Sequence, residues 1–408
     1  MVTEKLDTPR SPREMSPFVV LTVVLESGER LPCLVDRSTW IPVRAGTRWA
    51  VRYRRYRVQS STLESNLRVL GRIYEWAERI ASLDLDDHLT SGSSLNARQI
   101  ESMVLYFRTR GQGTETVVGS DPGALDHHLS IAENFLKWAL DSDNRGGVRT
   151  LTLEQLSAQR SHLEQVFRSL RTGTKQSQRI QPLSDQELAS LRQILAPKTE
   201  SGGDWVFPRG VFYRHTQLRN WLMVETALEL GLRRGELLKL RLDSIPRGSD
   251  DGLRVLRRPD DPHDSRQREP AVKTAERVVP VSRSLLSIFR AYLISKPPLG
   301  RVTGKTPYLF VTGTGVPLSV KASDDIMRAI ARHSGIAPMS WHRLRHTWAE
   351  RVAEVLAEQP NGMDKLNYLG GWTNPQSSKR YIQDTIAKQA SDAMRSYQSR
   401  LYKEGSSR

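Results

Sequence analysis

Three short segments in the second half of the chain carry side chains that suit chemistry on a phosphate group. Arg233 and Glu236 follow a helical pattern, Lys273 precedes a strand pattern, and His342 and Arg345 are separated by one helical turn. An arginine fork can hold two phosphate oxygens, and a histidine or lysine can move a proton. Taken singly, each pattern is also typical of a solvated surface.

An aromatic pair follows these segments. Trp372, in Leu369-Gly-Gly-Trp372, precedes Tyr381 by nine residues. A tyrosine phenol can attack phosphorus, and the resulting phosphotyrosine keeps the bond energy needed for rejoining without ATP. A lone tryptophan or tyrosine is more typical of a protein core.

The order and spacing of these segments resemble those of the tyrosine recombinase family, also called the phage integrase family. The resemblance runs from about Ser61 to the end of the chain. It implies a site-specific DNA recombinase that cleaves and rejoins strands through a 3′-phosphotyrosine and a Holliday junction. It assigns to the active site Arg233, Lys273, His342, Arg345, Trp372 and the nucleophile Tyr381, with Glu236 as a supporting acid. Tyr368 and Tyr397 are rival nucleophiles that lack the nine-residue spacing.

Attack on phosphorus builds negative charge on the non-bridging oxygens, so the site must present donors to them. We expect Arg233 and Arg345 to be these donors and His342 to take the proton of Tyr381. The resemblance makes Lys273 the general acid for the leaving 5′ oxygen. Because arginines neutralise the charge, we expect neither a metal nor another cofactor, and activity in EDTA.

Two residues of the set have less direct roles. Many family members have histidine where this chain has Trp372, and the sequence Gly-Gly-Trp-Thr-Asn resembles the Cre-like variant of the site. An indole N–H can donate a hydrogen bond but cannot transfer a proton. A carboxylate beside a phosphate would repel it, so Glu236 is expected to orient Arg233 or His342.

The composition favours a polyanionic partner. The 408 residues contain 61 Lys and Arg against 45 Asp and Glu, a net charge of +16. Such a surplus favours nucleic acid, although an acidic membrane surface or a merely solubilising charge excess also fits. The longest apolar run, residues 18–25, is too short to span a membrane, and no secretory signal is recognisable. The single cysteine, Cys33, excludes an internal disulfide.

The hydrophobic patterns predict a mainly α protein with a small β component. We expect an N-terminal extension with a β-hairpin over residues 1–58, an all-helical core-binding (SAM-like) domain over 59–171, a linker over 172–182, and an α-rich α+β catalytic domain over 183–408. Capping boxes are predicted at Ser61 and Glu64 and at Ser184 and Glu187. Short strands are predicted over residues 253–256, 277–281 and 308–311, with 257–270 as an exposed loop.

A cluster of arginines lies outside the region of strongest resemblance. The five are interleaved with aromatic residues: Arg48, Arg52, Arg54, Arg55 and Arg57. This composition suits phosphate contacts and equally suits a basic edge strand. Residues 1–58 match no family element, so they form either an additional DNA-binding module or a contact with another subunit.

The resemblance also implies the partners. The DNA partner is double-stranded DNA at specific recombination sites, on which the chain is expected to form a homo-tetramer at the synapse and to be a monomer or dimer when free. Accessory DNA-bending or partner recombinase proteins are the other expected partners, and no membrane contact is expected. The stripe of apolar residues after Tyr381 is typical of a C-terminal exchange helix, or of packing onto its own domain. We expect a cytoplasmic, nucleoid-associated protein. The alternatives are a DNA-binding accessory protein without catalysis, a type IB topoisomerase and a metal-dependent transposase.

Overall fold

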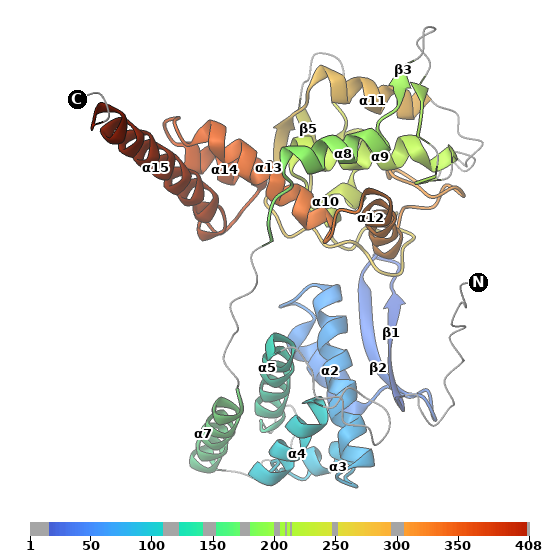
Figure 1. Ribbon diagram of the computed structural model, residues 1–408. Helices are drawn as coiled ribbons and strands as arrows, with labels where there is room; N and C mark the ends of the chain where they lie inside the picture. The colour runs from blue at the N-terminus through green and yellow to red at the C-terminus, as the bar shows by residue number, and fades with distance from the viewer. Residues whose placement is uncertain are drawn as a thin grey trace, which may run out of the picture. The chain divides into compact units, whose positions relative to one another are not determined.

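The computed structural model describes residues 16–108, 122–141, 152–171, 180–199, 205–208, 210–212, 214–246, 252–294 and 306–405 (Figure 1). The chain divides into two compact units, Met1–Gln178 and Arg179–Arg408. Of the predicted linker, residues 172–179 lie outside the described residues, and 180–182 have no regular secondary structure.

The first unit combines a β-hairpin with helices. Its elements are β1 (Phe18–Val24), β2 (Arg30–Asp36), α1 (Arg44–Arg48), the π-helix η1 (Trp49–Arg54), α2 (Ser60–Arg79), α3 (Leu85–Thr90), α4 (Ala97–Arg108), α5 (Pro122–Ala139) and α7 (Leu153–Leu170). β1 and β2 are antiparallel, with Phe18 opposite Asp36 and Val24 opposite Arg30. The predicted hairpin is confirmed.

The hairpin belongs to the same compact body as the helices. Both strands pack against α2, and Leu34 of β2 is buried in one core with Trp49 of η1 and Leu70 of α2. This shared core crosses the predicted division between residues 58 and 59. Its physical reason is that the inward face of β2 supplies core side chains that α2 needs for burial.

The first capping box was also mispredicted. α2 begins at Ser60, so its N-cap is Gln59, which makes no side-chain capping hydrogen bond. Ser61 is thus inside the helix, and the Glu64 carboxylate pairs with Arg68 one turn on. The second predicted box is confirmed, with Ser184 and Glu187 bonding each other's backbone N–H groups.

The second unit is mostly helical with small sheets. Its elements are α8 (Asp185–Leu195), β3 (Lys198–Thr199), β4 (Trp205–Val206), α9 (Arg214–Leu230), α10 (Arg234–Lys239), the 3₁₀-helix η2 (Leu242–Ser244), β5 (Gly252–Val255), β6 (Arg277–Pro280), α11 (Arg283–Ile294), α12 (Val320–Ser334), α13 (Trp341–Leu356), α14 (Gly362–Gly370) and α15 (Gln376–Gly405). β3 pairs with β4 and β5 with β6, both antiparallel. The predicted fold class, mainly α with a small β component, is confirmed.

Two details of this unit correct the sequence analysis. Residues 308–311 form no strand: Tyr308 and Val311 make single bridges, to Arg241 and Pro317. The segment 257–270 is not a uniformly exposed loop, because Asp264 and Arg266 are buried in it as an ion pair. A pattern of charge and proline predicts exposure, but paired charges can be buried.

α13 is the element around which the site is built. It packs against α9, α14 and α15, and its central turns are buried. No helix among the described residues is long and apolar enough to cross a membrane.

Candidate active site

Glu236 is the hub of a buried charge cluster. Its side chain is 0% exposed and accepts hydrogen bonds from Arg277 Nη1 at 2.7 Å and Arg277 Nη2 at 3.2 Å. It also accepts from the backbone N–H of Arg233 at 2.6 Å and from the Thr274 hydroxyl. Burial alone would raise the pKa of this carboxyl, but the hydrogen bonds and charge of Arg277, and then the charge of Arg345, hold the pKa below its ordinary value.

The position of Glu236 follows from local helix chemistry. α10 begins immediately after Arg233, which makes Arg233 the N-cap residue and Glu236 the third residue of the helix. A carboxylate at that place reaches back to the N-cap N–H and lies at the positive end of the helix dipole. The predicted supporting role of Glu236 thus has a geometric basis, through Arg233 and Arg277.

Arg345 is fixed between the C-terminal ends of two helices, α9 and α14. Its Nη1 donates to the Gly231 carbonyl and its Nη2 to the Gly370 carbonyl, both at 2.6 Å. Its Cζ lies 4.5 Å from the Trp372 ring centroid, so Trp372 covers the guanidinium. Burial and then the nearby charge of Arg233 lower the pKa of Arg345 to about 9, which leaves it charged at neutral pH.

Glycine is required at the C-terminal end of α9. Gly231 ends α9 with φ at +61°, and a Cβ there would lie 2.1 Å from the Trp348 ring. Only glycine combines this left-handed backbone with so close an approach. The carbonyl that holds Arg345 is thereby presented at a fixed place.

Arg233 has unused hydrogen-bonding capacity. Its Nη1 is buried and has no partner among the residues that the structure describes. Burial lowers the pKa of Arg233 and the charge of Glu236 opposes that effect. Arg233, Arg277 and Arg345 against the single carboxylate of Glu236 give 3 − 1 = +2 net charges. Such an excess beside an unpaired donor suits a bound oxyanion such as phosphate.

A tyrosine and two histidines form a chain of contacts at the same place. The Tyr381 hydroxyl lies 2.6 Å from His346 Nδ1, and His346 Nε2 lies 2.9 Å from His342 Nε2. Tyr381, in the first turns of α15, is 7% exposed and interacts electrostatically with Arg233 and Arg345. The phenol thus has a proton acceptor beside it and cations around it.

The structure brings most of the residues singled out in the sequence into one site. Arg233, Glu236, Arg345, Trp372 and Tyr381 are all connected by contacts or by electrostatic interaction. His342 is exposed and contacts His346, whose Nδ1 lies 2.6 Å from the Tyr381 hydroxyl. Lys273 is exposed, in the segment before β6 and next to Thr274.

Sequence reasoning missed two members of the site. His346 lies beside Tyr381, where His342 was expected. The sequence signal that could have identified His346 is its i, i+4 spacing from His342, which puts both on one helix face. Arg277 was read only as the start of a strand, yet its side chain is buried against Glu236 and donates from Nε to the Leu369 carbonyl at 2.7 Å. A charged residue at an inward strand position was the available signal.

The arginine cluster of the first unit divides into two groups. Arg55 donates to both carboxylate oxygens of Glu29, and Arg54 lies half-buried with its Cζ 5.4 Å from the Trp49 ring centroid. Arg48, Arg52 and Arg57 are exposed. The segment is helical, which excludes the basic edge strand.

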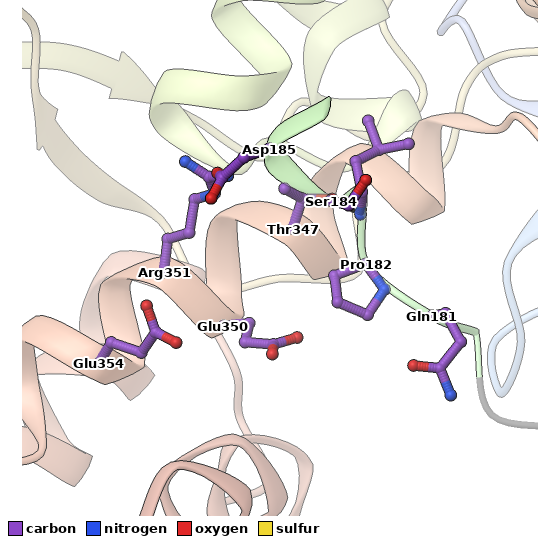
Figure 2. A pocket seen from close by; sticks show the side chains of 9 residues that line it. Gln181, Pro182, Ser184, Asp185, Thr347, Glu350, Arg351 and Glu354 are labelled. Carbon is purple, nitrogen blue, oxygen red and sulfur yellow. Dashed lines mark hydrogen bonds and ion pairs between the residues drawn. The ribbon is translucent and has the colours of Figure 1, made fainter. Parts of the chain in front are cut away.

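A pocket of about 460 Å³ lies beside α13 but does not suit a phosphate (Figure 2). Its charged lining residues are Asp185, Glu350, Arg351 and Glu354, three acids against one base. Thr347, Arg351 and Glu354 repeat at four and three residues, so they share a helix face different from that of Arg345. The reacting groups therefore lie outside this pocket. No cluster of residues suited to hold a metal ion occurs among the described residues.

Comparisons with known proteins find similarity to one family. The model of the phage integrase family matches residues 212–388. A tyrosine recombinase XerD from Listeria innocua is 27% identical over 153 residues, which are 37% of this chain and 46% of that protein. Transposase A from transposon Tn554 of Staphylococcus aureus is 32% identical over 143 residues, 34% of this chain and 37% of that protein. The chain thus matches less than half the length of these relatives.

Solved structures agree on the fold. The Tn1549 transposon integrase in complex with circular intermediate DNA has 15% identity and a TM-score of 0.51, over 85% of this chain and 99% of that one. The same integrase in complex with transposon right end DNA has 16% identity and a TM-score of 0.50, over 86% of this chain and 99% of that one.

Proposed function

We propose that this chain, which matches the phage integrase family over residues 212–388, belongs to that family, also called the tyrosine recombinase family, and is a site-specific DNA recombinase of the integrase or transposase type. It breaks and rejoins DNA strands by transesterification, through a 3′-phosphotyrosine and a Holliday junction. The observation that carries this proposal is the contact between Tyr381 and His346 inside a cluster with an excess of buried cations.

The chemical step uses the groups already described. The Tyr381 oxygen attacks phosphorus, its proton passes to His346 Nδ1, and the P–O5′ bond breaks while the Tyr–O–P bond forms. His342 is hydrogen-bonded to the far nitrogen of His346 and shares the positive charge that His346 acquires with the proton. The leaving 5′ oxygen takes a proton from Lys273. Rejoining runs the same steps backwards with a new 5′ hydroxyl.

The guanidinium groups stabilise the transition state. Arg233 offers the unpartnered Nη1, and Arg345 is held by two carbonyls and the Trp372 ring, so both are preorganised for the non-bridging oxygens. Trp372 thus acts by stacking on Arg345 as well as through its indole N–H. Because these arginines neutralise the developing charge, the reaction needs neither a metal nor another cofactor.

The partners follow from the same proposal. The substrate is double-stranded DNA at specific sites, bound by a homo-tetramer on the synapse that assembles from monomers or dimers, with accessory DNA-bending or partner recombinase proteins. Arg48, Arg52 and Arg57, which are exposed, contact DNA phosphates, whereas Arg54 and Arg55 are less exposed and are held by Trp49 and Glu29. The protein works at the nucleoid, and its C-terminal helix α15 serves exchange between subunits.

Replacing His346 by glutamine should slow formation of the covalent protein–DNA adduct by about 10²- to 10⁴-fold, the usual contribution of a general base. The same change at His342, which contacts the far nitrogen of His346, should cost much less. Adduct formed per minute with one DNA preparation measures both. A larger loss in the His342→Gln protein would contradict this assignment and restore the role expected from the sequence.

The function itself is tested by trapping. The protein is mixed in EDTA with sheared DNA from its source organism and stopped with SDS, and the DNA that remains attached is recovered and its ends are sequenced. We expect attached DNA with shared end sequences. Attachment that requires a divalent metal would contradict the mechanism, attachment without shared ends would favour a type IB topoisomerase, and binding without attachment would favour an accessory protein.

A further inference from the structure

The segment between β5 and β6 contacts α10 at three successive points before β6 begins. Lys239 pairs with Glu269, the backbone at Gly235 meets that of Ala271, and the Glu236 carboxylate accepts from Thr274. Lys273 lies between the second and third of these contacts. One short helix therefore touches the segment on both sides of this lysine.

The first contact is part of a buried ionic network. The Lys239 side chain is 3% exposed, and its Nζ lies 3.5 Å from Asp264 Oδ2 in addition to its pairing with Glu269. Asp264 is itself paired with Arg266, Nη2 to Oδ2 at 2.7 Å. Charges this deeply buried remain in place only while their partners do, so the network resists opening.

The same network closes the segment on itself and onto α10. Glu269 accepts the backbone N–H groups of Asp260 at 3.0 Å and Asp261 at 3.1 Å. Arg266 Nη1 donates to the carbonyl of Leu238 in α10 at 3.1 Å and to that of Leu318 at 2.9 Å. The path of the chain from residue 260 to residue 269 is thus fixed relative to the end of α10.

The second contact requires a glycine. A Cβ at Gly235 would lie 2.0 Å from the carbonyl oxygen of Ala271 and 2.9 Å from its carbonyl carbon. Both atoms are backbone, so the clash could be relieved only by moving the segment away from α10. An added methyl group at Gly235 would therefore displace the chain two residues before Lys273.

We propose that Lys239 and Gly235 are positioning residues for Lys273. They hold the segment 260–274 along α10, the helix that also carries Glu236, and so keep the lysine at a fixed position relative to the active-site arginines. This inference rests on the proposed function, in which Lys273 gives a proton to the leaving 5′ oxygen. Neither residue touches the reacting atoms. Their loss should therefore reproduce, in weaker form, the loss of the Lys273 ammonium group.

A DNA linkage with a sulfur in place of the bridging 5′ oxygen separates this role from a general one. A thiol has a pKa near 8.5, so a thiolate leaves without being protonated, whereas an alkoxide needs a proton. We would prepare two pools of random-sequence duplexes, one ordinary and one with a single 5′-bridging sulfur at a fixed position. The readout is the rate at which SDS-stable protein–DNA adduct forms with each pool.

On ordinary DNA, Lys239→Met and Gly235→Ala should lower this rate by about 10- to 100-fold, the scale of a small misplacement of a catalytic group. On the sulfur pool both should return to the wild-type rate, as should the reference variant Lys273→Met. Lys321→Met removes an exposed lysine of α12 and is the matched control, with wild-type rates on both pools. Where Lys239→Met fails to fold, Glu269→Gln takes its place, since it removes the charge that pairs with Lys239 and keeps an amide oxygen that can accept one of the two backbone N–H groups.

The outcomes separate this inference from the proposed function. Two outcomes would overturn the inference alone. In the first, folded Lys239 and Gly235 variants react at the wild-type rate on ordinary DNA. In the second, they react slowly on both pools although the sulfur restores the rate of Lys273→Met. Failure of the sulfur to restore Lys273→Met would overturn the role of Lys273 and the inference with it. Absence of adduct from the wild-type protein with both pools would contradict the proposed function itself.

Discussion

Replacing Tyr381 by phenylalanine should abolish covalent attachment to DNA while leaving DNA binding intact. The substitution removes only the phenolic oxygen, which is the proposed nucleophile, and loss of a nucleophile costs about 10⁶-fold where it has been removed from a comparable covalent enzyme. The ring stays packed between Trp372 and His346, and the lost hydrogen bond to His346 costs about 1 kcal/mol of stability. SDS-stable adduct and equilibrium binding to the same DNA are the two measurements.

Two other tyrosines serve as controls for this result. Tyr397 lies further along α15 and is exposed, and Tyr368 in α14 is exposed with its hydroxyl 3.4 Å from the Val278 backbone nitrogen. Tyr397→Phe and Tyr368→Phe should both keep the adduct. If the adduct survives in Tyr381→Phe and disappears in either control, the control tyrosine is the nucleophile and Tyr381 is not.

Replacing Glu236 by glutamine should destabilise the second unit by about 3–5 kcal/mol, the usual cost of leaving buried charges without their partner. The change keeps the shape of the side chain but leaves Arg277 and Arg345 without a buried anion. Denaturant unfolding of the two proteins measures the difference. Asp324→Asn, which breaks an exposed pair with Arg234, is the matched control and should cost no more than about 1 kcal/mol.

The effect of the Glu236 substitution should depend on pH in a defined direction. The folded-state pKa of Glu236 is lowered from an ordinary 4.5, so its ionisation stabilises the fold above the unfolded-state pKa and this stability is lost as the pH falls through the folded-state pKa. The stability difference between wild type and Glu236→Gln should therefore be full at neutral pH and shrink below about pH 4.5. A difference that stays constant into acid would contradict the charge-based explanation.

Much of the site could be predicted from residue types and spacing. The spacing of Arg233, Arg345 and Tyr381 carries the resemblance to the tyrosine recombinase family that assigned them to the site, and the structure brings them together from the start of α10, from α13 and from α15. Periodicity could not distinguish His342 from His346, because residues four apart share a helix face and only packing against α15 decides which one meets the tyrosine.

Other features depend on contacts between segments that lie far apart in the chain. Burial of the 257–270 segment requires Lys239 as a partner for its acids, and the sequence contains no local signal of that pairing. The union of the hairpin with the helical domain likewise depends on Leu34 packing against α2. Local patterns predict elements, whereas burial of paired charges and shared cores is decided by tertiary packing.

The most direct test of the central claim is to identify the amino acid that becomes joined to DNA. Wild-type protein is trapped on DNA in EDTA, digested with nuclease and protease, and the modified peptide is fragmented in a mass spectrometer. We predict a nucleotide attached through phosphate to Tyr381, in a peptide that is unmodified when the protein is denatured before mixing. A nucleotide on Tyr368, on Tyr397 or on a residue other than tyrosine, or a DNA cut with no nucleotide on the protein, would contradict the account.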